Sequence, residues 1–380
     1  MTEKVLIHSN LYTGNEHIAD GFIRFTDKII ETGKMADYRP KAGEEVIDGK
    51  GMTTIPGMID VHIHGGYGID AMDADPEALV TLSQKLRQEG VTSFFATTMT
   101  QDYGKIEAAL RAVKAAKEKG GTTIEGIHLE GPFVSKKRAG AQPLEYIKAP
   151  DTELFLKWFE ASGNLIKLVT YAPENEGARE FENVMIERGI VPSIGHSDAV
   201  RAKLLQSKAT HATHLYNGMR GLHHREPGVA GHALLSPYVQ VELIVDGIHV
   251  HPDMVKFTYE IKGPEKISVI TDAMRAKGLP DGESELGGQK VLVKNGEARL
   301  ENGALAGSIL KMDDAFRNIM KFTGCSIAEA VQMTSVNQAR EFGLEQKGSL
   351  TAGKDADFVL LDEQLQVKAT YHLGEQPVAQ

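Results

Sequence analysis

Short apolar runs recur through the middle of the chain, and segments with helical periodicity, such as 76–89, 105–119 and 253–262, separate most of them. Most of these runs have the apolar pattern of parallel strands covered on both faces. The eight runs are 58–62, 91–96, 124–129, 165–171, 190–194, 209–215, 241–245 and 267–270. Eight alternations of strand and helix predict an α/β fold of the (β/α)8 barrel type, with a doubly wound open sheet as the structural alternative.

The two ends of the chain follow another pattern, with short runs rich in β-branched residues and broken by Gly, Asn and Asp. These runs are 4–8, 21–26, 28–31, 358–362 and 366–371. We predict one small sheet domain built from residues 1–54 and 350–380, and a barrel over residues 55–349. An insertion at 284–305 is predicted to form a β-hairpin after the eighth barrel strand.

The composition is that of an ordinary globular protein, but the charge balance restricts its partners. The chain has 380 residues, with 42 Lys and Arg against 52 Asp and Glu, and a formal net charge of −10. An acidic protein repels phosphate backbones, so we expect no nucleic-acid partner. A few local cations can still hold one phosphate group, so a small anionic ligand is compatible with this charge.

The single cysteine, Cys325, excludes an intrachain disulfide and favours a reducing compartment. The first ten residues lack the apolar core of a signal peptide, and no apolar stretch has the length needed to span a bilayer. These features predict a cytoplasmic protein that does not associate with membranes.

Side chains suited to metal binding follow several predicted strands at their carboxyl ends, where (β/α)8 barrels carry their active sites. His62 and His64 are two residues apart, so a strand presents both imidazoles on one face. The residues in such positions are His62, His64, Glu130, His196, His214 and Asp272. A lone histidine there is more often structural, and HxH alone is a weak motif, but the joint pattern indicates a metal site. Imidazole and carboxylate suit Zn, Fe or Mn, and Glu130 is placed to bridge two ions.

Two residues near these strand ends have more than one interpretation. Asp272, within Thr-Asp-Ala, suits a proton shuttle between a metal-activated water and a leaving amine, but it also suits a helix cap. His128 shares a strand face with Glu130 and is interpreted as a partner of a metal ligand or as a packing residue. The remaining histidines of interest, predicted to be structural or solvated, are His8, His17, His211 and His372.

Loops after the later strands carry groups suited to an anionic substrate. The stretch 217–228 follows the sixth strand and contains Arg225, which suits either a phosphate held by paired hydrogen bonds or a surface ion pair. Residues 246–249 follow the seventh strand. The turn at 305–308 precedes a helix, so its backbone N–H groups are available to a polar ligand.

Several segments match a known enzyme family. The segments are IPGMIDVHIHGG, GIHLEGPF, GHSDA, THLYNGM, HHREPG, DGIHVHP, ITDAMRAKG and LAGSIL. Together they resemble the N-acetylglucosamine-6-phosphate deacetylases, and the tail GSLTAGKDADFVLLD resembles the closing segment of the wider amidohydrolase superfamily. The match extends from about residue 50 to residue 362. HLEGPF and HHREPG are fairly specific to the family, whereas HxH and the tail mark only the superfamily.

The resemblance implies a (β/α)8 barrel that carries a small β-sandwich formed from both chain ends. It implies Glu130, His196 and His214 as ligands of a principal metal, with His62 and His64 as ligands of a second metal. The expected cofactors are one or two divalent ions per subunit, drawn from Zn, Fe, Mn and Co. Some family members lack the histidine pair and use one metal, and this chain keeps the pair, which favours two.

The resemblance also implies a reaction and a set of substrate contacts. The reaction is deacetylation of N-acetyl-D-glucosamine 6-phosphate by attack of a metal-bound hydroxide, with Asp272 as general base and acid. The implied contacts are Ala141, Gln142, Asn217, Gly218, Arg225, His249, Ala306, Gly307 and Ser308. Gln142 stands where one-metal members can carry a carbonyl-polarising histidine, and Gly218 stands where alanine is common. Family members pair as homodimers, and the loop 223–225 is predicted to reach the neighbouring active site.

Other functions fit part of the same pattern. A deacetylase of N-acetylgalactosamine 6-phosphate is the nearest alternative, because the HHREPG loop accounts for a phosphate without separating the two hexosamines. Another amidohydrolase, such as a cyclic amidase, has no phosphate for that loop to hold. A metal-binding scaffold without catalysis is disfavoured, because a scaffold has no need for a proton shuttle at Asp272.

Overall fold

In the computed structural model, which describes residues 2–376, eight apolar segments pair as parallel strands in the order of the chain. The strands are β6 (Met58–Ile63), β9 (Val91–Thr97), β10 (Ile124–Glu130), β11 (Ile166–Tyr171), β12 (Val191–Ile194), β13 (His211–Ala212), β14 (Gln240–Ile244) and β15 (Ile267–Ile270). Every residue of β6, β9, β14 and β15 is buried, as expected for strands covered on both faces. The predicted barrel is confirmed, and the doubly wound alternative is wrong, because the strand order never reverses.

The barrel closes where β6 meets the segment after β15. The backbone N–H of Asp272 donates to His62 O at 2.8 Å, and the N–H of His64 donates to Ala273 O at 2.9 Å. We call these two hydrogen bonds the closing seam. The seam joins the first and last strands at their carboxyl ends, which is the end of the barrel where all the predicted metal ligands lie.

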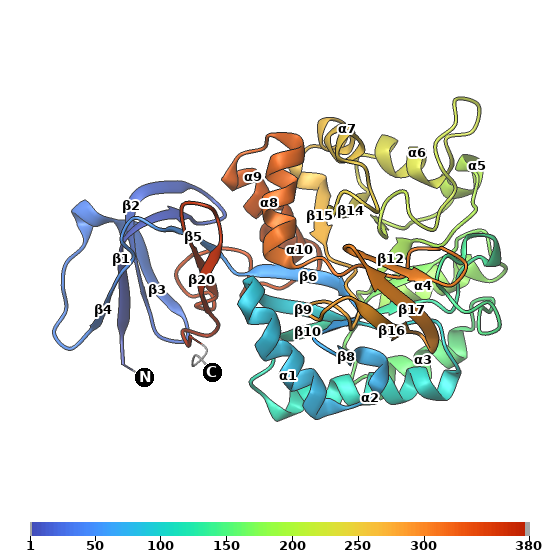
Figure 1. Cartoon of the computed structure of the whole chain (residues 1–380), viewed down its shortest axis with the longest axis horizontal. Helices are drawn as coiled ribbons and strands as arrows, with labels where there is room; N and C mark the ends of the chain where they lie inside the picture. Colours follow the sequence, from blue (N-terminus) through green and yellow to red (C-terminus); the bar gives the residue numbers. More distant parts are fainter. Residues whose placement is uncertain (1, 377–380) are drawn as a thin grey trace.

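Helices cover the outside of the barrel (Figure 1). They are α1 (Pro76–Leu86), α2 (Tyr103–Lys119), α3 (Thr152–Ala161), α4 (Ala178–Glu187), α5 (Arg201–Leu204), α6 (Gly228–Leu235), α7 (Pro252–Lys262), α8 (Met312–Thr323), α9 (Ile327–Val331) and α10 (Asn337–Glu341). Asp75, Asp102 and Asp151 accept backbone N–H bonds at the starts of α1, α2 and α3, each contributing about 1 kcal/mol. Among the described helices, none combines the length and apolar character that crossing a membrane requires.

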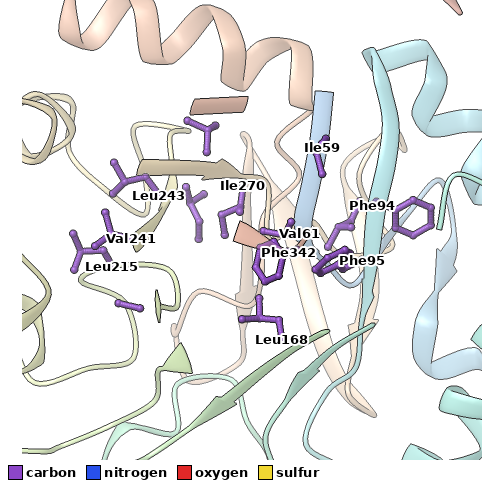
Figure 2. Close-up of a cluster of buried hydrophobic side chains, with 14 of the residues drawn as sticks. Ile59, Val61, Phe94, Phe95, Leu168, Leu215, Val241, Leu243, Ile270 and Phe342 are labelled. Carbon is purple, nitrogen blue, oxygen red and sulfur yellow. The ribbon is translucent and has the colours of Figure 1, made fainter. Parts of the chain in front are cut away.

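Apolar side chains form a continuous core within the barrel and beneath its helices. Figure 2 shows part of this core, with labels on Ile59, Val61, Phe94, Phe95, Leu168, Leu215, Val241, Leu243, Ile270 and Phe342. Phe95 of β9 meets Phe342, just after α10, edge to face with ring centroids 4.9 Å apart. Such contacts anchor the last barrel helix on the strands, and burying one aromatic ring of this kind contributes roughly 1.5–3 kcal/mol.

Both chain ends contribute to a second sheet of seven strands, which lies beside the barrel (Figure 1). Its strands are β1 (Lys4–Tyr12), β2 (His17–Phe25), β3 (Ile29–Lys34), β4 (Glu45–Asp48), β5 (Thr53–Pro56), β19 (Phe358–Leu361) and β20 (Val367–Tyr371). β1 pairs with β4 near its start and with β5 near its end. It therefore belongs to both layers of a sheet that folds over on itself.

Aromatic rings fill the space between these two layers. Phe25 of β2 lies 5.0 Å from Phe358 and 5.7 Å from Tyr371, measured between ring centroids, although β2 pairs with neither β19 nor β20. The sheet therefore folds over its own core, as the predicted β-sandwich requires. The domain boundaries at residues 54 and 350 stay a prediction, and residues 1 and 377–380 of that predicted domain lie outside the described part of the chain.

The insertion after β15 forms three antiparallel strands, so the predicted hairpin at 284–305 is wrong by one strand. The strands are β16 (Gly282–Leu286), β17 (Gln289–Lys294) and β18 (Glu297–Leu300). Two-residue turns connect them, Gly287-Gly288 and Asn295-Gly296, and all four residues have positive φ, as tight hairpin turns of this type require. The buried side of the insertion packs on Met99 and Met274 at the mouth of the barrel.

A buried ion cluster links the barrel to the second sheet. Lys347 Nζ lies 2.6 Å from an Asp357 carboxylate oxygen, 2.8 Å from one of Asp355 and 3.6 Å from one of Glu125, which belongs to β10. Burial by itself lowers the pKa of Lys347, but the charges of Asp357 and Glu125 outweigh this effect and raise it. The ammonium therefore stays charged and neutralises carboxylates from both parts of the molecule.

Replacing Lys347 with alanine leaves these buried carboxylates without their cation. We expect Lys347→Ala to lower the free energy of unfolding by about 3–5 kcal/mol, measured by urea denaturation. Lys41→Ala is the matched control, because Lys41 pairs with Glu3 at 3.0 Å while half exposed, and its loss should cost at most about 1 kcal/mol. Equal effects in the two variants would contradict the role given to the cluster.

Candidate active site

Six predicted residues converge at the carboxyl ends of the barrel strands. They are His62 in β6 and His64 just after it, Glu130 at the end of β10, and His196, His214 and Asp272 just after β12, β13 and β15. Each is at most 7 % exposed. Buried imidazoles and carboxylates must pair with one another or bind an ion, because an isolated charge in such a place is costly.

Glu130 lies at the centre of the group, and its two carboxylate oxygens face different histidines. Oε1 lies 3.1 Å from Nε2 of His196 and 3.1 Å from Nε2 of His214, and these two nitrogens are 3.1 Å apart. Oε2 lies 3.2 Å from Nε2 of His64 and 3.8 Å from Nε2 of His62. One carboxylate therefore connects two separate groups of ligand atoms.

Asp272 completes the second of these groups. Its Oδ1 lies 3.3 Å from Nε2 of His62 and 3.2 Å from Nε2 of His64. Nε2 of His62 is buried and makes no hydrogen bond with any described residue. On the first group, His196 Nδ1 donates to Arg138 O at 2.8 Å, which leaves His196 Nε2 with a free lone pair. Bare imidazole nitrogens beside carboxylates are donors that fit divalent metal ions.

Three of these residues have an unusual backbone conformation. His196, His214 and Asp272 have φ of 45°, 30° and 49°, although none of them is glycine. A left-handed conformation costs of order 1–3 kcal/mol per residue and persists only where the surroundings enforce it. With this backbone, His196 and His214 face Glu130, and Asp272 faces His62 and His64.

His128 lies against a candidate ligand and outside the two groups of ligand atoms around Glu130. Its ring lies edge to face against His62, with centroids 4.4 Å apart, and its Nε2 is 2.7 Å from Thr170 Oγ1. The residue therefore restrains the His62 ring from one side. It acts as a packing residue and, through that packing, as a partner of a candidate metal ligand. Of the other histidines, His8, His17 and His372 lie in or beside the second sheet, away from this site.

A cavity of about 380 Å³ opens onto the candidate metal ligands around Glu130. Its volume lies within the ~300–1,000 Å³ range of small-molecule sites. From the predicted metal and catalytic set it exposes His64, Glu130, His196, His214 and Asp272, and from the predicted substrate contacts Ala141, Gln142, Asn217, Gly218, His249 and Gly307. A larger hollow of about 520 Å³, beside Ser135 and Lys148, contains none of the metal-ligand candidates. We therefore place the active site in the smaller cavity.

Several predicted substrate contacts have defined surroundings in the cavity wall. Gln142 Oε1 accepts the Thr100 N–H at 3.0 Å, and His249 Nδ1 lies 2.6 Å from an Asp246 oxygen. A Cβ added to Gly218 would lie 2.7 Å from His196 Nδ1, so alanine at this position would require the ring or the loop to shift. The glycine therefore leaves room for a candidate metal ligand.

The structure places three of the predicted substrate contacts outside this cavity wall. Arg225 is exposed and hydrogen-bonds to His224 at 2.8 Å. Ala306 and Ser308 are buried, and their N–H groups already donate to Ala298 O and Asp272 O, at 3.0 and 2.7 Å. Gly307, between them, does border the cavity. Roles for Arg225, Ala306 and Ser308 in substrate binding stay predictions.

Two further features escaped the sequence interpretation. Arg299, in β18, lines the cavity, but its proximity follows from the folding of the insertion and not from any motif. Glu242 lies in β14 and contacts His62, and it had a visible signal, since it is the one charged residue in the apolar run 241–245. His211 is buried against it, so of its two predicted environments the solvated one is wrong.

A closed parallel barrel with histidines and carboxylates gathered at the carboxyl ends of its strands fits the class of metal-dependent hydrolases. Residues 53–377 match the model of the Amidohydrolase family. The N-acetylglucosamine-6-phosphate deacetylase of Bacillus subtilis is 47% identical, covering 98% of this chain and 97% of that protein. The chain belongs to the amidohydrolase family and, within it, to the N-acetylglucosamine-6-phosphate deacetylases.

Two further comparisons extend the similarity to other hexosamine-phosphate deacetylases. The structure of a mutant of the Mycobacterium smegmatis deacetylase, in complex with N-acetyl-D-glucosamine-6-phosphate, has a TM-score of 0.93 at 31% identity and covers 99% of both chains. The N-acetylgalactosamine-6-phosphate deacetylase of Escherichia coli O157:H7 is 37% identical, over 84% of this chain and 86% of that protein. Similarity therefore extends to both hexosamine deacetylases and is higher for the glucosamine enzyme of Bacillus subtilis.

The electrostatics of the site couple metal binding to pH. Burial by itself lowers the pKa of His64, but hydrogen bonds to Asp272 and Glu130 raise it to about 10, and the pKa of His62 is likewise raised. A histidine binds a metal only in its neutral form, so below these pKa values an incoming ion must displace protons.

We expect Zn²⁺ binding at pH 7 to release protons and the apparent affinity to rise as the pH is raised toward the pKa of His64, about 10. Calorimetry in buffers of different ionisation enthalpy measures the number of protons released. Binding that is independent of buffer and pH would show that the histidines are already neutral.

Proposed function

We propose that this protein hydrolyses the acetamide of N-acetyl-D-glucosamine 6-phosphate to D-glucosamine 6-phosphate and acetate. The observation that carries the proposal is the position of Asp272, whose Oδ1 lies within 3.3 Å of His62 and His64 on the wall of a cavity of substrate size. Membership of the deacetylase family supplies the substrate class.

The donor groups described above suit two ions per subunit. We propose Glu130, His196 and His214 as ligands of the principal metal, and His62 and His64, with Glu130 Oε2 nearby, as ligands of a second one. When bound, divalent ions polarise the acetyl carbonyl and make a water molecule more acidic. Zn, Fe, Mn and Co all accept these ligands, and metal supply often decides among them.

Asp272 moves the proton in this mechanism. It takes a proton from the water that attacks the acetyl carbonyl and delivers that proton to the sugar nitrogen as the C–N bond breaks, so the water oxygen ends in acetate. Its backbone is held on both sides, since its N–H donates to His62 O at 2.8 Å and its carbonyl accepts the Ser308 N–H at 2.7 Å. The carboxylate can therefore serve both steps from one fixed backbone position.

The sugar phosphate is proposed to lie along the remaining cavity wall. The proposed contacts are Ala141, Gln142, Asn217, Gly218, His249 and Gly307, with Ala306 and Ser308 shaping the last turn. His249 is proposed to face the phosphate, with Asp246 at 2.6 Å fixing its ring. Binding energy from a phosphate remote from the acetyl group helps to orient the bond that breaks.

Arg225 is proposed to complete phosphate binding from a second subunit. It is exposed and lies outside the cavity of its own chain, within the loop 223–225. In a homodimer with two-fold symmetry, if the loop of one subunit reaches the active site of the other, the second loop reaches the first active site in the same way. The cytoplasm is the proposed compartment for this dimer, because its substrate is a phosphorylated sugar and its one cysteine is unpaired.

Acetate release from N-acetylglucosamine 6-phosphate by the purified, metal-loaded protein tests the function. We expect a chelator to abolish release and added metal to restore it. Asp272→Asn should keep its metal but lose turnover by about 10²–10⁴-fold, because the proton shuttle is gone. Asp253→Asn, at a side chain 90% exposed, is the control and should remain normal.

No release from the metal-loaded protein would refute the substrate, and near-normal turnover by Asp272→Asn would refute the role of that residue. The same assay with N-acetylgalactosamine 6-phosphate separates the alternative hexosamine, since a preference for that epimer would reassign the substrate.

Arg225→Ala should harm turnover of the phosphorylated sugar far more than turnover of free N-acetylglucosamine, because only the first has a phosphate to bind. Arg111→Ala, on the exposed face of α2, is the matched control. Equal losses on both substrates would show that Arg225 does something other than bind phosphate.

A mixed dimer distinguishes the subunit from which Arg225 acts. Combining Arg225→Ala subunits with Asp272→Asn subunits should restore activity if Arg225 acts across the dimer, because one site then holds both intact residues. No restoration in a verified mixed dimer, or full activity in a monomer, would show that Arg225 does not act across subunits.

A further inference from the structure

Glu242 is a carboxylate at the centre of an apolar barrel strand, with no exposed surface. Its neighbours in β14 are Val241 and Leu243, which are also fully buried. A buried carboxylate is retained only where hydrogen bonds or ions compensate for its loss of hydration. The contacts of Glu242 therefore indicate what it does.

Three hydrogen bonds to the Glu242 side chain, and a fourth between His211 and Glu341, connect the active site with the end of α10. Its Oε2 accepts from His62 Nδ1 at 2.9 Å and from the His214 backbone N–H at 2.9 Å. Its Oε1 accepts from His211 Nε2 at 3.1 Å, and His211 Nδ1 in turn donates to Glu341 Oε1 at 2.9 Å. A buried chain thus runs from a candidate metal ligand to the end of α10.

This chain of hydrogen bonds determines which nitrogen of His62 is available to bind a metal ion. Because Nδ1 is bonded to Glu242, Nε2 is the ring nitrogen left to bind an ion once its own proton is displaced, and this atom faces Asp272 and Glu130. Hydrogen bonding at one ring nitrogen sets the tautomer and orientation of a metal-binding histidine. His128, edge to face at 4.4 Å, limits rotation of the same ring.

The contact is asymmetric between the two groups of ligands. Glu242 bonds the ring of His62, which belongs to the second group, but only the backbone of His214, which belongs to the first. The ring of His196 is oriented instead by Arg138 O. Loss of the Glu242 carboxylate should therefore disturb the position beside His62 and His64 before the position at Glu130, His196 and His214.

We infer that Glu242 is a positioning residue for the second metal position, and that His211 and Glu341 hold its carboxylate toward His62. The inference rests on the proposed two-metal site. His211 suits this task because each of its ring nitrogens faces a carboxylate oxygen, so the ring is clamped between Glu242 and Glu341. His62, His128 and Glu242 also have ligand atoms close enough to one another for an ion, but here Nδ1 of His62 is already hydrogen-bonded to Glu242.

Zn²⁺ titration of the full-length protein, with bound metal counted by elemental analysis, tests this inference. We expect two ions in the wild type, and in Glu242→Gln a second ion bound about 10–100-fold more weakly, the usual effect of losing a partner of a metal ligand, with the first ion little changed. Glu182→Gln is the matched control, since Glu182 is also a buried carboxylate but bonds Tyr171 and Ser207, and it should keep both affinities.

Glu341→Gln provides a second test at the far end of the hydrogen-bond chain. Its side chain is 14% exposed, so this substitution should disturb folding less than one at the fully buried Glu242. It should weaken the second ion alone, by less than Glu242→Gln does. Unchanged second-ion affinity in both variants, equal loss of both ions, or a wild type that binds one or three ions would overturn the inference.

The outcome is independent of the substrate. Selective weakening of the second ion in a protein that releases no acetate would support the role of Glu242 while refuting the proposed function. Acetate release by the wild type, with a second-ion affinity that neither substitution changes, would support the proposed function and refute the role of Glu242.

Discussion

The closing seam between β6 and the segment after β15 is the constraint on which the site depends. Its two hydrogen bonds set the first barrel strand against the last, and so place His62 and His64 within 3.3 Å of the Asp272 carboxylate. Glu130 can contact both histidine pairs only because the barrel is closed and its strand ends form a ring. An open sheet of the same strands would spread these residues along an edge.

Most of the fold, and the gathering of the candidate metal ligands, could be predicted from the sequence because both depend on local pattern. Apolar runs identify the strands, and in a parallel barrel all strands end on one side, so residues after each run are brought together whatever the details of packing. The sixth run, 209–215, is the instructive exception. Only His211 and Ala212 pair as a strand, and the chain then turns so that His214 leaves the sheet with φ of 30°.

What the sequence could not provide depends on which elements become neighbours. Glu242 gains its meaning from His62 and His211, which lie on different strands. Arg299 reaches the cavity only because two tight turns fold the insertion into three strands over the barrel mouth. Arg225 illustrates a limit of another kind, since its motif predicts phosphate binding but its own chain holds it outside the cavity.

The second sheet has a consequence for the order in which the molecule is made. β5 pairs with β1 on one side and with β19 on the other, and β19 is synthesised after the whole barrel. On the ribosome, the N-terminal strands must therefore wait with an unpaired edge, and with Phe25 lacking the rings of Phe358 and Tyr371. Exposed edges invite pairing with other chains, so this protein is most vulnerable to misassembly during the interval when its barrel is complete and its ends are still apart.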